Sequence, residues 1–326
     1  MTTNRKKVLV PSNMGKAGVD LLARRDDIDV QTYSSLITQA DLLPLLPDAA
    51  GISLSATPFR QAEMDAAERM EVVARIGVGY DAVDVSALTA RKVPLMIAGT
   101  SNSTSVAEHA LYLIMALAKR GPMLHQVVRE GRWAEGRGSL PAELAGKMVV
   151  IVGFGCIGTR LARRCAAMEM TVIVYDPYVA ADTIRAAGCE PAADLDAALP
   201  GADFVSINCP KTPETVGLFN AARIGRMKRG ACIVNTARGG IIDEPALHDA
   251  LTSGHLAGAG LDVFDAEPTP PTNGLLQFAQ VIASPHMAGV TTESVAGMAV
   301  VTAQNILGVL DGTPNRNNAV NREVLD

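Results

Sequence analysis

The sequence is poor in aromatic residues and its cysteines form no recognisable pairs. Aromatic residues make up 4% of the 326 residues, and the five cysteines are scattered without a C-x-x-C motif. Neither a zinc ribbon nor a dithiol redox centre is indicated, and we expect no metal site. Single cysteines beside apolar residues are typical of small buried side chains in a reducing compartment, so we expect a cytoplasmic protein.

Long apolar runs and an excess of basic charge are also missing. The longest apolar run, 110–118, is far shorter than the roughly 20 residues that a membrane-spanning helix needs. The start, MTTNRKKVLV, turns into a short strand pattern without a small-residue cleavage site, so we expect no signal peptide. The formal net charge is −5, without a basic stripe. We therefore expect neither a membrane nor a nucleic acid as partner.

What the chain does contain is an alternation of β-rich runs and helical patterns, in two series. In the first series, helical patterns at 17–24 and 60–68 lie between β-rich runs, and Asp81-Ala-Val-Asp84 marks a turn and a helix start, since Asp is a preferred N-cap. The second series has six strand-like runs and ends in a helix predicted at 292–310. Such alternation predicts parallel βαβ units, and six strands match a complete dinucleotide-binding sheet. The expected strands are 8–10, 28–31, 51–55, 72–76, 93–96, 148–152, 171–175, 203–208, 231–235, 257–263 and 281–284.

A long apolar helix is expected between the two series. Ser105 and Glu108 have the spacing of a capping box, which places the helix at 106–118. The pair Gly121-Pro122 is a stop signal. His109 lies within this apolar pattern and is interpreted as structural.

A glycine fingerprint joins the first strand of the second series to its helix, predicted at 159–167. Gly153 allows a tight turn, Gly155 lets a pyrophosphate approach the backbone, and Gly158 lets helix and strand pack closely. The helix N-terminus then offers unpaired N–H groups to the phosphates. Asp176 ends the next strand, where a carboxylate accepts hydrogen bonds from the ribose and repels a 2′-phosphate. The sequence therefore predicts NAD as cofactor rather than NADP.

Three further segments with reactive side chains follow strands of this series. Arg238 lies in 235–240, Asp262 and Glu267 lie in 261–268, and His286 lies in 284–289. Open α/β sheets bind ligands at the carboxyl ends of their strands, so these side chains are expected in one cleft.

The chemistry that suits them is hydride exchange between a nicotinamide and a 2-hydroxy or 2-oxo acid. Histidine moves the proton, and the Glu267 carboxylate fixes its tautomer and stabilises the imidazolium. Arg238 offers a charged, forked donor to the substrate carboxylate and carbonyl oxygen. Asp262 is expected to hold the nicotinamide carboxamide.

Taken together, these residues resemble the D-isomer-specific 2-hydroxyacid dehydrogenases, which act on acids such as phosphoglycerate, glycerate or hydroxypyruvate, D-lactate and formate. The resemblance implies an α/β fold with two Rossmann- or flavodoxin-like doubly wound parallel-sheet domains and an active-site cleft between them. Residues 1–101 and 290–326 would form the substrate domain, and residues 102–289 the NAD-binding domain. The segments that carry it are 105–109, 153–158, 208–210, 212–215, 235–240, 261–268 and 284–289.

The resemblance also implies roles for individual residues. The catalytic set is Arg238, Glu267 and His286. The substrate carboxylate would bind backbone N–H groups of Val78 and Gly79, while Leu54 and Ser55, with Val78, would set side-chain preference. The implied cofactor contacts are Gly153, Gly155, Cys156, Ile157, Gly158, Asp176, Cys209, Pro210, Thr215, Thr236, Arg238, Asp262, His286 and Gly289.

At some positions this chain differs from members of the family with a known substrate, and these differences reduce the number of candidate substrates. Formate-specific members carry Gln where this chain has Glu267, although Asn102 matches an asparagine that they use. Phosphite-specific members carry Lys at the position of Val78, and phosphoglycerate enzymes tend to place a basic residue at the position of Leu54. We therefore expect a small unphosphorylated acid, such as glyoxylate, hydroxypyruvate or a related 2-oxo acid.

The resemblance further implies a homodimer through the cofactor domain, formed by the helix 106–118 and by the segment 129–141, which is interpreted as an arm. Trp133 on this arm either enters the partner's site or anchors the arm to its own surface. The alternative function is an NAD(H)-sensing binding protein or corepressor of the same fold, since such proteins keep the catalytic residues. Tight NADH binding without turnover, together with a recovered protein partner, would favour that alternative.

Overall fold

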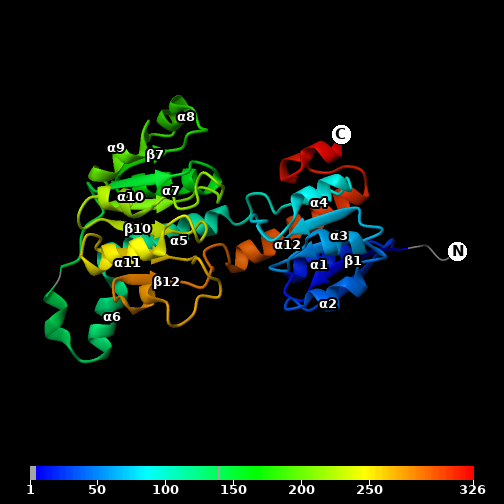
Figure 1. Cartoon of the computed structure of the whole chain (residues 1–326), viewed down its shortest axis with the longest axis horizontal. Helices are drawn as coiled ribbons and strands as arrows, with labels where there is room; N and C mark the ends of the chain where they lie inside the picture. Colours follow the sequence, from blue (N-terminus) through cyan, green and yellow to red (C-terminus); the bar gives the residue numbers. More distant parts are fainter. Residues whose placement is uncertain (1–4, 139) are drawn as a thin grey trace. The chain divides into compact units, whose positions relative to one another are not determined.

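The computed structural model divides into two compact α/β units, each with its own parallel sheet (Figure 1). Unit 1 contains Met1–Asn102 and Val290–Asp326, and unit 2 contains Ser103–Gly289. The structure describes residues 5–138 and 140–326. Two predictions extend to residues outside this range. Residues 1–4 belong to the start for which no signal peptide is expected, and residue 139 belongs to the expected arm. Two doubly wound parallel-sheet domains are the fold class that the sequence predicts.

Unit 1 is built on five parallel strands in the order β2-β1-β3-β4-β5. This is the flavodoxin-like order, and it places the switch point between β1 and β3. Asp84 accepts a hydrogen bond from the Ala87 N–H at the start of α4, which confirms the predicted helix start. The strands are β1 (Lys6–Pro11), β2 (Ile28–Tyr33), β3 (Ala49–Leu54), β4 (Val72–Arg75) and β5 (Leu95–Met96). The helices are α1 (Lys16–Ala23), α2 (Gln39–Leu42), α3 (Gln61–Ala66), α4 (Val85–Ala90) and α12 (Thr292–Leu310).

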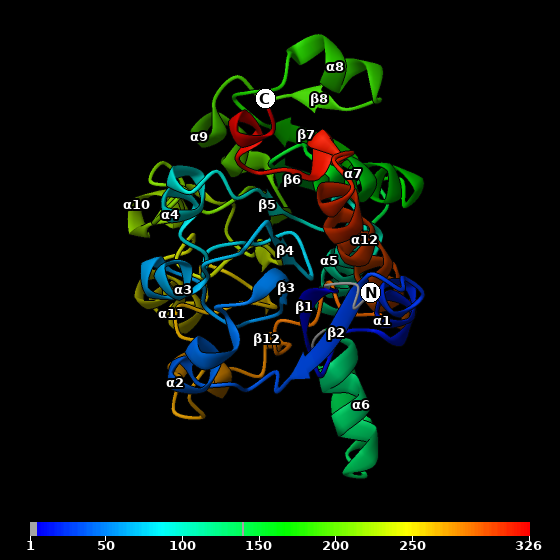
Figure 2. The same ribbon diagram turned by 90° about the vertical axis from the view of Figure 1, so that its right-hand side faces the viewer.

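Helix α12 returns to unit 1 and closes one face of its sheet. It lies beside α1 in Figure 2, and its Ala299, Ala303 and Ile306 are buried against residues of β1 and β4. By length and composition, α12 is the one helix of the described residues that could cross a membrane. The buried residues of α12 belong to the core of unit 1.

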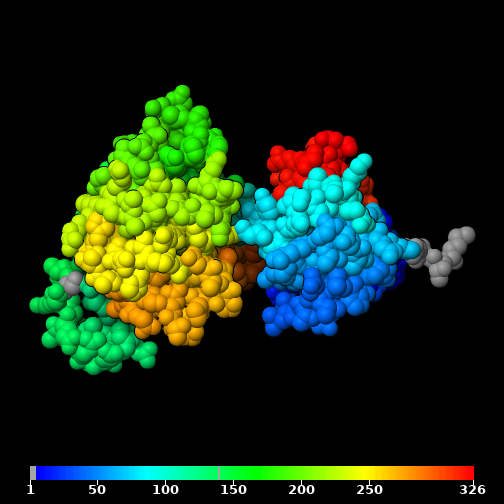
Figure 3. Space-filling model, viewed as in Figure 1, coloured from blue at the N-terminus to red at the C-terminus, as the bar shows by residue number. Residues whose placement is uncertain are grey.

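The last residues also belong to unit 1, where the red C-terminal segment lies against cyan segments in the space-filling view (Figure 3). The Asn321 side chain accepts a hydrogen bond from the Leu95 N–H at 2.8 Å, and the Val320 N–H donates to the Leu95 carbonyl. These bonds extend the edge at β5, so the tail completes this unit.

Unit 2 is built on seven parallel strands in the order β12-β11-β10-β9-β6-β7-β8. Six of them follow the order of a dinucleotide-binding sheet, and β12 adds a seventh at one edge. The order reverses between β6 and β9, which makes this the switch point. The strands are β6 (Met148–Val152), β7 (Thr171–Tyr175), β8 (Glu190–Pro191), β9 (Phe204–Ile207), β10 (Cys232–Asn235), β11 (Gly258–Leu261) and β12 (Val281–Ala283). The helices are α5 (Ser103–Lys119), α6 (Gly121–Arg129), α7 (Cys156–Ala167), α8 (Ala181–Ala186), α9 (Leu195–Ala198), α10 (Ala221–Arg226) and α11 (Glu244–Thr252).

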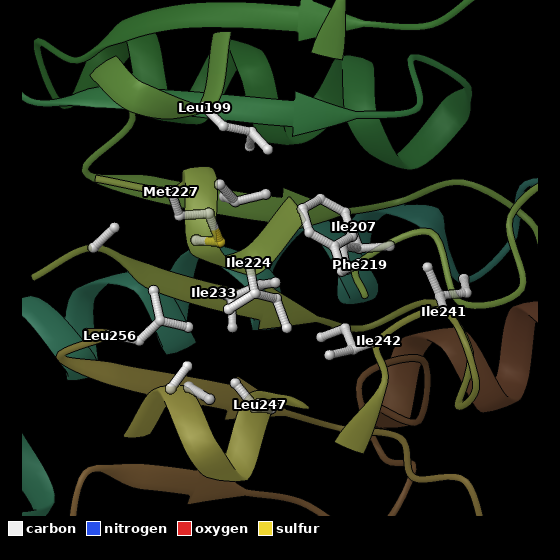
Figure 4. Close-up of a cluster of buried hydrophobic side chains, with 14 of the residues drawn as sticks. Leu199, Ile207, Phe219, Ile224, Met227, Ile233, Ile241, Ile242, Leu247 and Leu256 are labelled. Carbon is white, nitrogen blue, oxygen red and sulfur yellow. The ribbon is translucent and has the colours of Figure 1, made fainter. Parts of the chain in front are cut away.

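Both faces of this sheet are covered by apolar packing. Helices α5 and α7 cover one face, where Leu113 and Leu161 meet β-branched strand residues such as Val149. Figure 4 shows the other face, where Phe219 and Leu247 gather with aliphatic side chains from β9 and β10. Strands that are buried on both faces consist of nearly continuous apolar residues. Most strands of this sheet could therefore be predicted from the sequence.

The predicted start of the long apolar helix is wrong by three residues. Helix α5 begins at Ser103, so Ser105 lies inside its first turn and is buried. Glu108 reaches Arg164 on α7 at 2.9 Å rather than capping the helix. Ser105 and Glu108 therefore have the spacing of a capping box without forming one, since Glu108 makes an ion pair with another helix.

Three further elements differ from the predictions. Helix α5 ends at Lys119, as the stop signal predicts, and the chain turns at Arg120, which has φ +52°. The helix α6, which Gly121-Pro122 then opens, was not expected, although proline is well suited to the first turn of a helix. Helix α7 begins at Cys156, three residues earlier than predicted. The strand β8 was not expected, since two residues at a sheet edge leave no apolar run.

Candidate active site

The site residues of unit 2 lie where parallel strands end. Gly153 follows β6, Asp176 follows β7, Arg238 follows β10, Asp262 follows β11 and His286 follows β12. The carboxyl ends of parallel strands meet at one edge of the sheet, so the order of the strands brings these loops together.

The glycine turn after β6 leaves no room for side chains at two of its three positions. Gly153 has φ +97°, and a Cβ there would lie 2.7 Å from the Cys209 nitrogen. A Cβ on Gly158 would lie 2.0 Å from the Gly153 carbonyl oxygen. Gly155, in contrast, has φ −75° and open space where its Cβ would stand. The turn therefore forms an open cradle at the N-terminus of α7, which fits the pyrophosphate of a dinucleotide.

Asp176 is held in a defined orientation beside this turn. Its Oδ2 accepts a hydrogen bond from the Phe154 N–H at 2.7 Å, and its Oδ1 accepts one from the Tyr178 N–H at 2.9 Å. A carboxylate has about four acceptor positions, so two remain for ribose hydroxyls. The Tyr178 hydroxyl also reaches Glu214, which joins the segment after β7 to the loop after β9.

We expect replacement of Asp176 to move cofactor preference toward NADP. In Asp176→Ala the carboxylate that repels a 2′-phosphate is gone, so the ratio of kcat/KM with NADH to that with NADPH should fall about tenfold or more. Asp176→Asn is the matched control, because it removes the charge and keeps an oxygen for the Phe154 N–H. Steady-state kinetics with both cofactors measures the ratio. An unchanged ratio in both variants would argue against the ribose role.

The other residues expected to contact the cofactor differ in whether their polar groups already have a partner in the protein. Thr236 is 7% exposed, and its hydroxyl oxygen is buried without a partner among the described residues. The Thr215 hydroxyl donates to the Pro210 carbonyl at 2.7 Å, which closes the loop that follows Cys209. Thr215 therefore shapes this loop through its hydroxyl. Cys156 and Ile157 lie in the first turn of α7, and Gly289 is the last residue of unit 2.

The five thiols, which are all free, differ sharply in accessibility. Cys156 at the start of α7 is exposed. Burial raises the pKa of Cys165 and of Cys232 to about 12, and that of Cys209 to about 11. Because the thiolate is the reactive form, these buried thiols are poor nucleophiles at neutral pH.

Alkylation should therefore report on the nucleotide cradle without any turnover. We expect iodoacetamide at neutral pH to modify Cys156 first, and bound NADH to slow this reaction several-fold by covering the first turn of α7. Peptide mass spectrometry identifies the modified cysteine and its rate. If Cys156 reacted equally fast with saturating NADH, the cofactor would not lie over this turn.

His286 and Glu267 form a close pair at the carboxyl ends of β11 and β12. The His286 Nδ1 lies 2.6 Å from Glu267 Oε2, and Glu267 Oε1 accepts a hydrogen bond from the Phe264 N–H at 3.0 Å. The Phe264 N–H thus fixes one oxygen of the carboxylate, and the Nδ1–H of His286 donates to the other. The imidazole is 48% exposed, and its Nε2 has no partner among the described residues. Nε2 is therefore the atom left to exchange a proton with a ligand.

Arg238 lies on a loop that abuts the loop carrying Glu267. The Asn235 side chain holds the Arg238 loop by two hydrogen bonds. It donates to the Arg238 carbonyl and accepts from the Ala237 N–H. A Cβ on Gly239 would lie 1.8 Å from the Phe264 carbonyl oxygen, and the Gly240 N–H donates to Asp265 at 2.6 Å. These contacts and the His286–Glu267 pair join the loops after β10, β11 and β12, which carry Arg238, Glu267 and His286.

Asp262 lies behind this surface and is 1% exposed. Its carboxylate accepts hydrogen bonds from the Ser284 hydroxyl at 2.6 Å and from the N–H groups of Met287 and Ala288 at 2.8 and 2.9 Å. One of its four acceptor positions remains, which is enough for a single external donor such as a carboxamide. The expectation that Asp262 holds a carboxamide is thus compatible with this geometry.

Sequence reasoning assigned no site role to two residues of this network. Ser284 lies between Asp262 and His109, whose Nε2 is 2.9 Å from the Ser284 hydroxyl oxygen. His109 lies on α5, and the apolar pattern around it predicts a structural residue. The signal that could have identified it is a lone histidine on the apolar helix that packs on the same sheet.

In unit 1 the structure corrects one expected substrate residue. Leu54 is fully buried, and its side chain packs in the core beside residues such as Ile52 and Val73. Every residue of β3 is buried, so the end of this strand belongs to the core and the Leu54 side chain offers no contact to a ligand. Ser55, the next residue, is half-buried.

The expected carboxylate loop of unit 1 has the form of an anion site. Arg75 Nε donates to the Gly79 carbonyl at 2.9 Å, and Gly77 has φ +126°, which favours glycine. Within the described residues, the N–H groups of Val78 and Gly79 donate to no protein acceptor. Consecutive free N–H groups in a turn are typical of anion-binding nests.

No cluster of three or more His, Cys, Asp or Glu side chains that could hold a metal ion occurs among residues 5–138 and 140–326.

Comparison with known proteins points to one family. Residues 111–288 match the model described as D-isomer specific 2-hydroxyacid dehydrogenase, NAD binding domain. A D-3-phosphoglycerate dehydrogenase from Archaeoglobus fulgidus is 35% identical over 316 residues, which cover 97% of this chain and 59% of that protein. This chain spans about half the length of the curated relatives that it matches.

Solved structures agree along nearly the whole chain. A protein from Thermus thermophilus is 32% identical with a TM-score of 0.88, and the match covers 96% of this chain and 99% of that one. A D-lactate dehydrogenase from Aquifex aeolicus, solved with NAD and lactic acid, is 26% identical with a TM-score of 0.85 and coverages of 96% and 98%. Both units of the fold therefore have counterparts in these proteins.

Proposed function

Since the chain belongs to the D-isomer specific 2-hydroxyacid dehydrogenase family, we propose that it is an NAD-dependent oxidoreductase that interconverts a D-2-hydroxy acid and its 2-oxo acid. The family match agrees with the NAD-binding domain expected from the glycine fingerprint and Asp176. The observation that carries the proposal is the His286–Glu267 pair, 2.6 Å apart, at the same sheet edge as the nucleotide cradle.

The proposed roles follow from the donors and acceptors that each side chain offers. Bound NADH supplies the hydride that reduces C2 of the oxo acid. His286 gives the proton on Nε2 to the substrate oxygen during reduction and takes it back during oxidation. Glu267 holds Nδ1–H and stabilises the imidazolium, while Arg238 binds the carboxylate and polarises the carbonyl oxygen. The free N–H groups of Val78 and Gly79 are the proposed second contact of the substrate carboxylate.

The substrate that we propose is a small unphosphorylated acid of the glyoxylate or hydroxypyruvate type. The support is the residue type at position 54, because this sequence has leucine where phosphoglycerate enzymes tend to carry a basic residue that meets the phosphate. The second candidate is a phosphorylated three-carbon acid, because the curated relatives are named D-3-phosphoglycerate dehydrogenases. Glu267, in place of a glutamine, argues against formate, and Val78, in place of a lysine, argues against phosphite.

The test is NADH consumption with a panel of small, branched, aromatic and dicarboxylic 2-oxo acids. Hydroxypyruvate and 3-phosphohydroxypyruvate form a matched pair that differs only in the phosphate. We expect a higher kcat/KM for hydroxypyruvate, whereas preference for the phosphorylated acid would favour the second candidate. If no acid consumed NADH above the blank while NADH bound tightly, the enzyme proposal would fail and a nucleotide-sensing protein would be favoured.

We further propose a homodimer formed through unit 2. Trp133 is 77% exposed and Leu140 is 79% exposed, so neither side chain is packed on its own subunit. Leu140 lines a hollow of about 410 Å³, together with residues of α5, of α6 and of the amino ends of the strands, such as Met123 and Phe204. Apolar exposure beside a hollow is typical of an interface, and light scattering should give about twice the 34.1 kDa of one chain.

The proposed compartment is the cytoplasm. All five cysteines are free, and most are buried as single thiols, which suits a reducing environment.

A further inference from the structure

We propose that His109 is a positioning residue for His286 and that it acts through Ser284 and Asp262. The inference deepens the proposed function, because it names a residue on which the proton-transfer geometry depends. It rests on a continuous chain of hydrogen bonds in unit 2 that runs from helix α5 to the loop after β12.

The contacts in this chain are short and specific. His109 Nε2 lies 2.9 Å from the Ser284 hydroxyl oxygen, and this hydroxyl lies 2.6 Å from Asp262 Oδ1. His109 Nε2 is also 3.9 Å from the same carboxylate oxygen. The three residues come from α5, from the segment after β11 and from the segment after β12, 175 residues apart at the extremes.

The direction of the hydrogen bonds follows from the protons available. An ionised carboxylate only accepts, so the single hydroxyl proton of Ser284 points to Asp262. The Ser284 oxygen then accepts from His109, which places a proton on Nε2 of that imidazole. The chain therefore runs from His109 Nε2–H to the Ser284 hydroxyl and on to the Asp262 carboxylate.

Asp262 needs this support because it is a buried charge. Its carboxylate is 1% exposed, and burial of a carboxylate is costly unless hydrogen bonds and nearby charge compensate for lost water. The donors are Ser284 and the N–H groups of Met287 and Ala288. Without the His109 imidazole, the lost hydration of the Asp262 carboxylate would be less well compensated. The hydrogen bonds from the Met287 and Ala288 N–H groups to this carboxylate would then weaken.

The same carboxylate shapes the backbone that carries His286. The His286 N–H donates to the Asp262 carbonyl at 2.8 Å, and His286 has φ +55°, a conformation that L-residues seldom adopt. Such a conformation persists only where the surroundings over-determine it. Bonds to Asp262 from residues 286, 287 and 288 provide that constraint, so the placement of the His286 imidazole depends on a well-fixed Asp262.

Helix α5 is a firm support for the other end of the chain. It packs directly on β11, where a Cβ on Gly260 would lie 2.9 Å from the Leu113 Cβ. The glycine allows this close approach of helix and strand. The His109 side chain is 22% exposed, so it is held within the packed layer rather than on the surface.

Two uncharged replacements of His109 separate hydrogen bonding from bulk. The amide nitrogen of glutamine reaches about as far as Nε2, whereas that of asparagine reaches only as far as Nδ1. We expect His109→Asn to lower kcat about tenfold with a KM for the oxo acid within threefold of wild type, and His109→Gln to recover most of kcat. His125→Asn, the same change at an exposed site on α6, is the matched control and should leave kcat unchanged.

Amide hydrogen exchange gives a readout that needs no turnover. We expect His109→Asn and Ser284→Ala each to speed exchange at Met287 and Ala288 about tenfold, while His109→Gln leaves it near the wild-type rate. The double variant His109→Asn with Ser284→Ala should match either single variant, because both changes break one chain.

The outcomes separate this inference from the proposed function. Unchanged exchange at Met287 and Ala288 in both His109→Asn and Ser284→Ala would overturn the positioning role, as would His109→Gln behaving like His109→Asn. Wild-type protein without turnover on any 2-oxo acid would instead overturn the proposed function, and the exchange measurements would still decide the role of His109.

Discussion

Replacing His286 with alanine is expected to lower kcat about a thousandfold while NADH affinity changes little. General acid–base catalysis by a positioned side chain contributes about 10²–10⁴-fold, and the Nε2 of His286 is the free ring nitrogen at the site. The oxo acid must receive a proton on its oxygen as hydride reaches C2, so loss of the imidazole leaves that step to water. Stopped-flow kinetics with saturating NADH and oxo acid measures the loss.

A matched control separates the proton donor from its partner. In Glu267→Gln the amide oxygen can still accept from Nδ1–H, but the negative charge that stabilises the imidazolium is gone. We expect a smaller loss of kcat, about 10–100-fold. If His286→Ala retained more than about a tenth of wild-type kcat, another group would be the acid.

The second large effect is expected at the nucleotide cradle, where two glycines should respond differently to alanine. Gly158→Ala would place a Cβ 2.0 Å from the Gly153 carbonyl oxygen, so the turn must shift and the protein should lose stability as well as NADH binding. Gly155→Ala meets no protein atom within 4 Å, and its φ of −75° is ordinary for alanine. Its methyl group would instead occupy the space through which the pyrophosphate approaches.

We therefore expect Gly155→Ala to melt within about 2 °C of wild type and to bind NADH at least about tenfold more weakly. Thermal unfolding of the protein without cofactor and NADH fluorescence titration supply the two numbers. Gly158→Ala should lower both the melting temperature and the affinity. Wild-type NADH affinity in Gly155→Ala would show that the phosphates do not pass over this turn.

The nucleotide-binding half of the fold could be predicted because its signals are local. The strand, the three glycines, the helix and Asp176 follow one another within about 30 residues, and each has a separate steric or electrostatic reason. The sequence also predicts that Arg238, Glu267 and His286 meet, because their segments follow strands and parallel strands end at one edge. Of these contacts, the structure has that between His286 and Glu267, at 2.6 Å.

Contacts between distant segments account for what could not be predicted. His109 fits the period of an apolar helix, and only the fold reveals Ser284, which is 175 residues away. Ser105 and Glu108 mimic a helix start because Glu108 pairs with Arg164 on another helix. Leu54 ends a strand whose residues are all buried, so alternation along the strand could not show that its side chain faces the core.

The central claim is that this chain moves a hydride from NADH to C2 of a 2-oxo acid while His286 supplies the proton. The most direct measurement uses NADH with deuterium at both C4 positions and follows the product by mass spectrometry. The account predicts one deuterium at C2 of a D-2-hydroxy acid for each NADH consumed, with this product formed about a thousandfold more slowly in His286→Ala. A hydroxy acid without deuterium at C2, or no hydroxy acid from wild-type protein with NADH bound, would contradict it.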